Sequence, residues 1–123
     1  MPQRNLATKA LARIMSALSH ADRLRIVEEL REGERDVGTL AACIGSSAVR
    51  VSQNMAVLRA HNLVLERREG RHVYYRLTHP PLARWVVEGL RFVTPDQQQT
   101  EALRNAVESA VAMWSTEPEG TAS

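Results

Sequence analysis

Cysteine, aromatic residues and lysine are all scarce in this sequence of 123 residues. Its single cysteine, Cys43, excludes an intrachain disulfide and suits a reducing compartment. Aromatic residues make up 4% of the chain, so a hydrophobic core must be mostly aliphatic. No apolar run reaches the roughly 18–20 residues that a membrane-spanning helix needs. Residues 1–15 also lack the continuous apolar segment of a secretory signal, so we expect a cytoplasmic protein with no membrane partner.

Charge is distributed unevenly along the chain. The formal net charge is only +2, but residues 46–78 carry six arginines against two glutamates, 6 − 2 = +4. Residues 94–123 carry one arginine against five acidic residues, 1 − 5 = −4. Arginine accounts for 15 of the 16 basic residues. Because a guanidinium offers forked donors that match phosphate and guanine edges, the central segment is expected to face a polyanion.

Apolar residues recur every three or four positions in the first third of the chain, which indicates helices. One amphipathic helix is expected at about 5–18. Ser19 is placed to cap a second helix, which Gly33 ends. Asp36 is then placed to cap a short helix over 37–44.

A longer helix follows a tight turn at Gly45. Either Ser46 or Ser47 can cap it, and its apolar pattern continues to about residue 61. The inward stripe of this helix, at spacings i, i+4 and i+7, consists of Val51, Met55 and Leu58.

After residue 62 the hydrophobic period changes from helical to strand-like. Two runs rich in Val, Leu and Tyr, at 63–69 and 72–78, flank Gly70 and Arg71. This pattern predicts a β-hairpin whose tip carries Glu69, Gly70 and Arg71.

Two proline-led segments complete the chain. Pro80-Pro81 is suited to open one helix, and Thr94-Pro95 to open another over 95–115, since proline fits the first helical turn. The polar tail 116–123 is expected to be disordered.

The expected order of elements is therefore α-α-α-α-β-β-α-α, a mainly α fold of the α+β type with a single domain over 1–115. The two helices that flank Gly45 form a helix-turn-helix, and the basic hairpin after them is a wing. The second helix of such a pair can lie in the major groove while the hairpin tip meets phosphate. The pattern predicts a winged helix-turn-helix that binds double-stranded DNA.

Three stretches, in this order and spacing, resemble the arsenic-repressor (ArsR/SmtB) family of winged-helix transcriptional repressors. They are LSHADRLRIVEEL at 18–30, VSQNMAVLR at 51–59 and GRHVYYRL at 70–77. The likeness covers about residues 5–93. It implies a homodimeric repressor that binds an imperfect inverted repeat and is released from DNA by an effector.

The resemblance also implies which side chains touch DNA. Ser52 and Gln53 match the pair that usually faces the groove, and Arg50 is placed for a forked contact with guanine. Family members often carry Gln where Ala48 stands and His where Asn54 stands, so the operator is expected to differ from the commonest one. The full expected set is Ser47, Ala48, Arg50, Ser52, Gln53, Asn54, Arg59, Arg68, Arg71 and His72.

In the family, the first and last helices supply the dimer interface. This implies that apolar side chains of the terminal helices contact a second copy of the chain. The expected interface residues are Leu11, Ile14, Trp85, Leu90, Leu103, Val107 and Trp114.

The family's sensor sites can be compared position by position, and their ligands are missing. The cysteine pair of one sensor type falls on 36–40, which holds no cysteine, and the second-helix cysteine of redox sensors falls on Glu28. The ligands of another metal site fall on His79, Pro81, Phe92 and Pro95. Three of these four cannot bind a metal. We therefore expect no cofactor, no metal of the usual kind and an effector of unknown identity.

Several alternatives stay open. Cys43 is expected to be a buried packing residue rather than a reactive thiol. An atypical histidine-based metal site would draw on His20, His61, His72 and His79. The aromatic residues of the terminal helices pack a core or an interface, or they line a small apolar effector pocket whose polar groups are Arg84, Glu88 and Arg91. The fold could also serve as a protein–protein interaction module without operator binding. No catalytic constellation is evident, so an enzyme is not expected.

Overall fold

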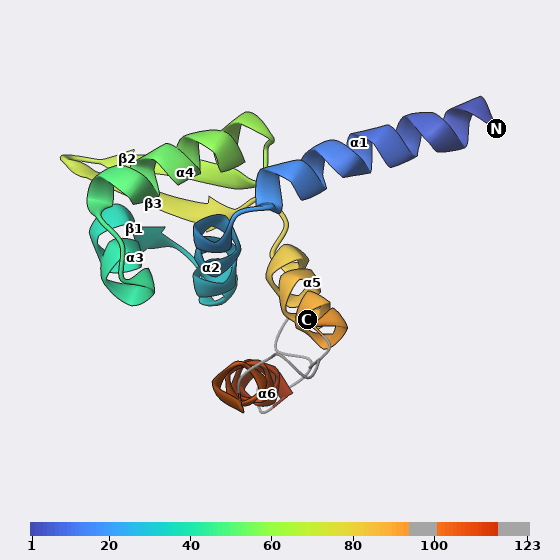
Figure 1. Cartoon of the computed structure of the whole chain (residues 1–123). Coiled ribbons are helices and arrows are strands. Elements are labelled where there is room, and N and C mark those ends of the chain that lie inside the picture. Colours follow the sequence, from blue (N-terminus) through green and yellow to red (C-terminus); the bar gives the residue numbers. More distant parts are fainter. Residues whose placement is uncertain (94–100, 116–123) are drawn as a thin grey trace. The chain divides into compact units, whose positions relative to one another are not determined.

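The computed structural model describes residues 1–93 and 101–115 (Figure 1). The chain divides into two compact units, Met1–Ala83 and Arg84–Ser123. The helices are α1 (Pro2–Leu18), α2 (Ala21–Glu29), α3 (Val37–Ile44), α4 (Ala48–Ala60), α5 (Pro81–Gly89) and α6 (Glu101–Ser115). Short 3₁₀ segments, η1 (Leu30–Glu32) and η2 (Leu90–Phe92), extend α2 and α5. The strands are β1 (Arg35–Asp36), β2 (Val64–Glu69) and β3 (His72–Leu77).

The core of the first unit forms where α2, α3, α4 and the sheet meet. Val51, Met55 and Leu58 of α4 are completely buried, which confirms the inward stripe predicted from their spacing. Ile26 of α2 and Leu40 of α3 are equally buried. Removing such aliphatic side chains from water contributes about 1.5–3 kcal/mol each, and this burial holds α4 in place.

The sheet has three antiparallel strands in the order β1-β3-β2. The hairpin β2–β3 was predicted, and its register runs from Val64 opposite Leu77 to Glu69 opposite His72. The short strand β1 was not predicted, because two residues carry no detectable period. It pairs with β3 through Arg35 and Tyr75, and thereby places α3 beside the hairpin.

The cap of α2 differs from the sequence prediction. The cap is His20 rather than Ser19, and its Nδ1 accepts a hydrogen bond from the Asp22 N–H at 3.3 Å. Ser19 Oγ instead donates to the Ser16 carbonyl oxygen and closes the end of α1. The chain leaves α1 through Ser19, so the residue that enters the next helix in extended conformation is His20.

Three further predictions meet different outcomes. Cys43 was expected to be buried, but its side chain is exposed on α3, so that prediction is wrong. The expected opening of the last helix at Thr94-Pro95 lies outside the described residues, as does the tail 116–123. The single domain over 1–115 stays a prediction.

No helix within the described residues has the length and apolar character needed to cross a membrane.

Candidate nucleic-acid interface

The turn between α3 and α4 is built from backbone geometry and one side-chain cap. Gly45 adopts the left-handed conformation, φ 66° and ψ 39°, which ends α3 and reverses the chain. The Ser46 N–H donates to the Ala41 carbonyl oxygen at 3.0 Å. Ser47 is the cap of α4, since its Oγ accepts from the Arg50 N–H at 3.1 Å. The first turn of α4 is therefore fixed in direction while its outer side chains stay exposed.

The outer face of α4 carries most of the side chains predicted to read DNA. Five of them are exposed, namely Ser47, Ala48, Arg50, Ser52 and Gln53. They lie in the N-terminal half of the helix, which is the half that a recognition helix presents to base edges. Hydroxyl, amide and guanidinium groups can all donate to base acceptors in the major groove.

Asn54 was expected to be exposed, and the structure shows that this prediction is wrong. It is only 9% exposed, and its Oδ1 accepts a hydrogen bond from Arg23 Nη1 of α2 at 3.2 Å. Asn54 therefore lies on the same side of α4 as Val51, Met55 and Leu58. A contact between this side chain and DNA is not proposed.

Val49 was missed by the sequence analysis. Its side chain is 66% exposed in the first turn of α4. An apolar side chain at this position can contact the methyl group of thymine. The signal was present in the sequence, because Val49 and Ala56 are seven residues apart on the face opposite the buried stripe, and both are exposed.

The loop of the hairpin consists of Gly70 and Arg71 only. Gly70 has a φ of 59°, a left-handed value that suits glycine in the first position of a two-residue hairpin loop. Arg71 and His72 are both exposed beside it. The predicted tip of the wing is confirmed as a loop with a free arginine.

Two of the arginines predicted to contact DNA are bound within the protein. Arg68 Nε donates to Glu66 Oε1 at 2.7 Å, and Arg59 of α4 binds the other oxygen of the same carboxylate. The Glu66 side chain is only 9% exposed. The hydrogen bond from Arg68 and the charge of Arg59 lower the pKa of Glu66 and keep it ionised. The sequence charge count treated these arginines as free, and the structure shows that one carboxylate engages both.

Arg67 is engaged on the other face of the hairpin. It donates through Nε and Nη2 to Glu34, with Nη2–Oε1 at 2.6 Å, and through Nη1 to Glu69 at 2.7 Å. Its guanidinium also lies over the Tyr74 ring, 4.6 Å from the centroid. The hydrogen bonds raise the pKa of Arg67, and they lower the pKa of Glu34.

These ion pairs change how the positive charge of the central segment is presented. Arg50 and Arg71 form no ion pair with any residue that the structure describes. One extends from α4 and the other from the hairpin loop. Arg50 and Arg71 therefore present free guanidinium groups from α4 and from the hairpin loop, whereas Arg59, Arg67 and Arg68 are held in ion pairs.

The residues predicted to contact a second copy are mostly uncovered. Leu11 of α1 is 48% exposed and Trp85 of α5 is 47% exposed, while Ile14 is partly buried. Only the last two residues of α1, Ala17 and Leu18, are buried. The side chain of Trp114 lies outside the described part of the chain.

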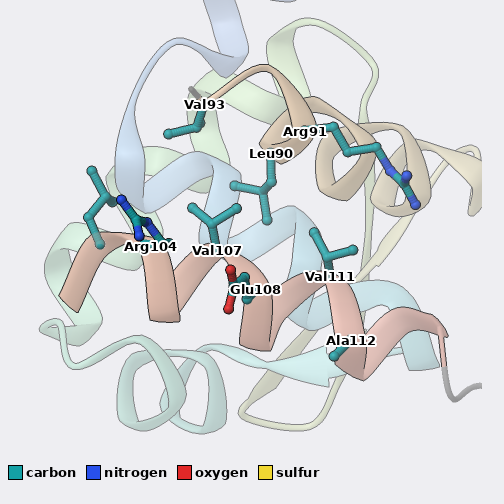
Figure 2. Close-up of a pocket in the computed structure, with 9 residues that line it drawn as sticks. Leu90, Arg91, Val93, Arg104, Val107, Glu108, Val111 and Ala112 are labelled. Carbon is teal, nitrogen blue, oxygen red and sulfur yellow. The ribbon is translucent and has the colours of Figure 1, made fainter. Parts of the chain in front are cut away.

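The three remaining predicted interface residues surround a cavity in the second unit. Leu90, Leu103 and Val107 line a space of about 440 Å³ together with Val93 and other residues of α6. Figure 2 shows Leu90, Val107 and Val111 pointing toward one another, with Glu108 and Arg104 beside them and Arg91 extending away. Arg91 is bound to Glu88, with Nε–Oε2 at 3.0 Å.

The four histidines do not come together in the structure. Across the described residues, no three His, Cys, Asp or Glu side chains are grouped in a way that could hold a metal ion. His20 caps α2, and His72 lies near Tyr74 with ring centroids 6.1 Å apart.

Comparison with known proteins connects this geometry to a family. A scan against protein-family models gives no match for the chain. The biofilm growth-associated repressor of Xylella fastidiosa is 40% identical over 76 residues, which are 62% of this chain and 67% of the repressor. The solved structure of the repressor BigR from Xylella fastidiosa has a TM-score of 0.64, 33% identity, and coverage of 78% of this chain and 100% of BigR. The arsenic resistance transcriptional regulator ArsR1 of Pseudomonas putida is 38% identical over 79 residues, which are 62% of this chain and 61% of ArsR1. The chain belongs to the ArsR family.

Two further comparisons agree with membership of the ArsR family. A DNA-binding domain from Mycobacterium bovis, described as a homodimeric winged helix-turn-helix and a possible ArsR-family regulator, has a TM-score of 0.61 and 26% identity. The alignment covers 97% of this chain and 96% of that domain. The HTH-type transcriptional regulator Rv0324 of Mycobacterium tuberculosis is 38% identical over 74 residues. These residues are 60% of this chain but only 33% of Rv0324.

The relatives carry the names of transcriptional regulators and repressors. This chain is accordingly a winged helix-turn-helix transcriptional regulator, with α3 and α4 as the helix-turn-helix and β2–β3 as the wing.

Proposed function

We propose that this protein acts as a homodimeric repressor that binds an inverted-repeat operator and carries out no catalysis of its own. One observation carries the proposal: α4 is fixed on the core by a fully buried stripe while Ser52 and Gln53 stay exposed in its N-terminal half. Arg50 and Arg71 flank this surface with free guanidinium groups that can bind a base edge and a phosphate.

Each side chain has a separate proposed role. Ser47, Ser52 and Gln53 contact base edges, and Ala48 allows close approach of the helix. Val49 packs against a thymine methyl group. Arg71 and His72 meet the backbone beside the half-site, and Arg59 and Arg68 reach phosphate after exchanging their bond to Glu66.

Selection from a random duplex library, followed by footprinting of the recovered sequence, tests operator binding. Recovery of an inverted repeat is expected, with protection of both halves. Gln53→Ala should weaken binding at one base position by roughly 1–3 kcal/mol and leave binding to random duplex unchanged. Failure to enrich any sequence over random duplex contradicts operator binding and favours the alternative of a protein–protein interaction module.

Arg71→Ala tests the proposed backbone contact. It should weaken binding to all duplexes about equally and reduce the slope of log affinity against log salt by about 0.9. Arg25→Ala is the matched control, since Arg25 binds Glu29 of its own helix at 2.9 Å and the substitution removes the same charge away from the interface. Equal effects of the two substitutions would contradict a local role for Arg71.

We propose that α1 joins the two copies through its uncovered apolar face, with Trp85 of α5 also in contact. Leu11 and Met15 lie one turn apart on the same side of α1 and are exposed in one copy, and a second copy would remove them from water. Leu11→Asp should shift the protein from dimer to monomer in sedimentation equilibrium. Arg13→Ala, at an exposed position two residues away, lowers the net charge by the same one unit and controls for the change in charge. A dimer that Leu11→Asp leaves intact contradicts this interface.

The cavity beside α6 supports a proposal for the effector. A space of about 440 Å³ falls within the range of small-molecule sites, and its lining is mostly aliphatic. Arg104 supplies a cation at the cavity, so we propose a small apolar ligand with one acidic group in place of the family's metal ions.

A panel of small aromatic and aliphatic carboxylates, titrated by calorimetry against the full chain, tests this cavity. Binding should be lost in Val107→Trp, which fills the space, and reduced in Arg104→Gln. A ligand that binds equally well to Val107→Trp would contradict the location. A tight stoichiometric metal ion in native mass spectrometry would contradict the ligand class and favour the atypical histidine site.

A further inference from the structure

Arg23 connects three helices of the first unit through two hydrogen bonds. It stands in the first turn of α2 and is partly buried. Its Nε donates to the Ala17 carbonyl oxygen at 2.5 Å, in the last turn of α1. Its Nη1 donates to Asn54 Oδ1 at 3.2 Å, in the middle of α4. A single rigid guanidinium therefore joins the end of α1 to the helix that carries Ser52 and Gln53.

The hydrogen bond to α1 supplies a donor for the Ala17 carbonyl oxygen at the C-terminal end of that helix. The last four carbonyl groups of a helix have no donor within it, and the end carries a partial negative charge. The last turn of α1 contains no basic residue of its own. Arg23 supplies the missing cation from α2, and within the described residues no carboxylate pairs with it.

The hydrogen bond from Arg23 to Asn54 fixes the rotation of α4, which apolar packing alone does not fix. Val51, Met55 and Leu58 hold α4 on the core, but burial of aliphatic surface has no directional preference. A hydrogen bond to a charged donor is directional and is stronger than a neutral one. Asn54 immediately follows Gln53 in the chain, so the bond from Arg23 fixes the rotation of α4 at the point where it faces outward.

We propose that Arg23 is a positioning residue that sets the angle of α4 relative to α1, and so sets the half-site spacing that the dimer accepts. The inference rests on the proposed function, in which α1 joins the two copies. Two half-sites face the same side of the DNA when their centres are about 10–10.5 base pairs apart, or a multiple of that distance. One base pair added between them therefore rotates one half-site relative to the other by about 35°. A dimer whose two α4 helices are held at a fixed angle cannot bind both half-sites after that rotation. A dimer whose α4 helices can turn still binds both.

The test measures spacing preference rather than affinity alone. The probe is the inverted repeat that the wild-type protein selects from a random duplex library, remade with its centre one base pair longer and one shorter. Asn54→Leu removes the acceptor in a nearly equal volume, and Arg23→Met removes both donors. Each should weaken binding to the native spacing roughly tenfold, as expected for loss of a charged hydrogen bond. Each should also reduce the discrimination between spacings while leaving the salt slope unchanged.

Two control variants separate positioning from charge. Asn54→Asp keeps an acceptor for Arg23 but adds a negative charge, so it should weaken binding to all three spacings equally and preserve the wild-type preference. Arg25→Ala removes a cation from the same helix, where it binds Glu28 and Glu29, and should also preserve the preference. Circular dichroism establishes that each variant is folded at the assay temperature.

The outcomes are distinct. Reduced discrimination in Asn54→Leu and Arg23→Met, with full discrimination in the two controls, is the expected result. A folded Asn54→Leu or Arg23→Met that discriminates between spacings as the wild type does overturns the proposal. Loss of folding in both variants would assign the bridge to stability and overturn it as well. A wild-type protein that selects no inverted repeat contradicts the proposed function itself, and the inference then falls with it.

Discussion

Arg68 and Glu66 lie two residues apart on one face of β2, with Arg68 Nε 2.7 Å from Glu66 Oε1. Arg59 binds the same carboxylate from α4. Both guanidiniums are well exposed while the carboxylate is nearly covered. Surface ion pairs of this kind contribute little to stability, about 0–1 kcal/mol, so they can be exchanged for a phosphate contact. Glu66 thus restrains two cations that would otherwise face the nucleic acid.

Glu66→Gln is expected to strengthen binding to duplex DNA of any sequence. The substitution keeps the shape of the side chain but removes the charge that holds Arg59 and Arg68. In the wild type both arginines must leave Glu66 before they bind phosphate, so the variant should bind more tightly while the slope of log affinity against log salt stays about the same. Fluorescence anisotropy across a salt series measures both the affinity and this slope. The control is Glu29→Gln, which removes a carboxylate bound to Arg25 of α2. An equal change in both variants would show only an effect of net charge.

The same carboxylate predicts a pH dependence of stability. The pKa of Glu66 is lowered from its ordinary value of 4.5, because Arg68 and Arg59 favour the ionised form. A lowered pKa in the folded state stabilises the fold at pH values above 4.5, and this contribution is lost as the pH falls through the folded pKa. The thermal midpoint of the wild type should therefore fall more steeply on acidification than that of Glu66→Gln. Parallel curves for the two proteins would contradict the coupling.

Gly45→Ala should destabilise the fold by about 1 kcal/mol, because an L side chain is strained in the left-handed conformation. A Cβ at Gly45 would meet no heavy atom within 4 Å, so the cost is conformational rather than steric. Gly38→Ala is the matched control in the same helix, where an added Cβ makes only an ordinary contact with Asp36. It should stabilise the protein by roughly 0.5–1 kcal/mol. Urea unfolding of both variants tests the opposite signs, and the same sign for both would be inconsistent with this backbone assignment.

Cys43 should react with a maleimide in the native protein, since its side chain is exposed on α3. The reaction is expected without denaturant, because the exposed side chain is accessible to the reagent. Mass spectrometry after timed labelling measures it. Cys43→Ser should retain the affinity of the wild type for the selected operator. A thiol that labels only after unfolding would contradict the observed exposure.

Local features of the fold were predictable from the sequence. The spacing of Val51, Met55 and Leu58 indicated the buried face of α4, and Asp36 and Gly45 marked the two ends of α3. The hairpin loop at Gly70 was equally readable. Each of these features depends on residues that lie within about one helical turn or one hairpin of each other. A sequence pattern over the same few residues can therefore predict them.

The sequence by itself determined the helix-turn-helix, the wing and the exposed positions of Ser52 and Gln53, because hydrophobic period and capping act between near neighbours in the chain. Only the tertiary structure decided which polar groups are free. Asn54 accepts a hydrogen bond from an arginine 31 residues earlier, and Arg67 is held by Glu34 across 33 residues. Partners this far apart are chosen by how the helices and strands pack, and no local pattern records that choice.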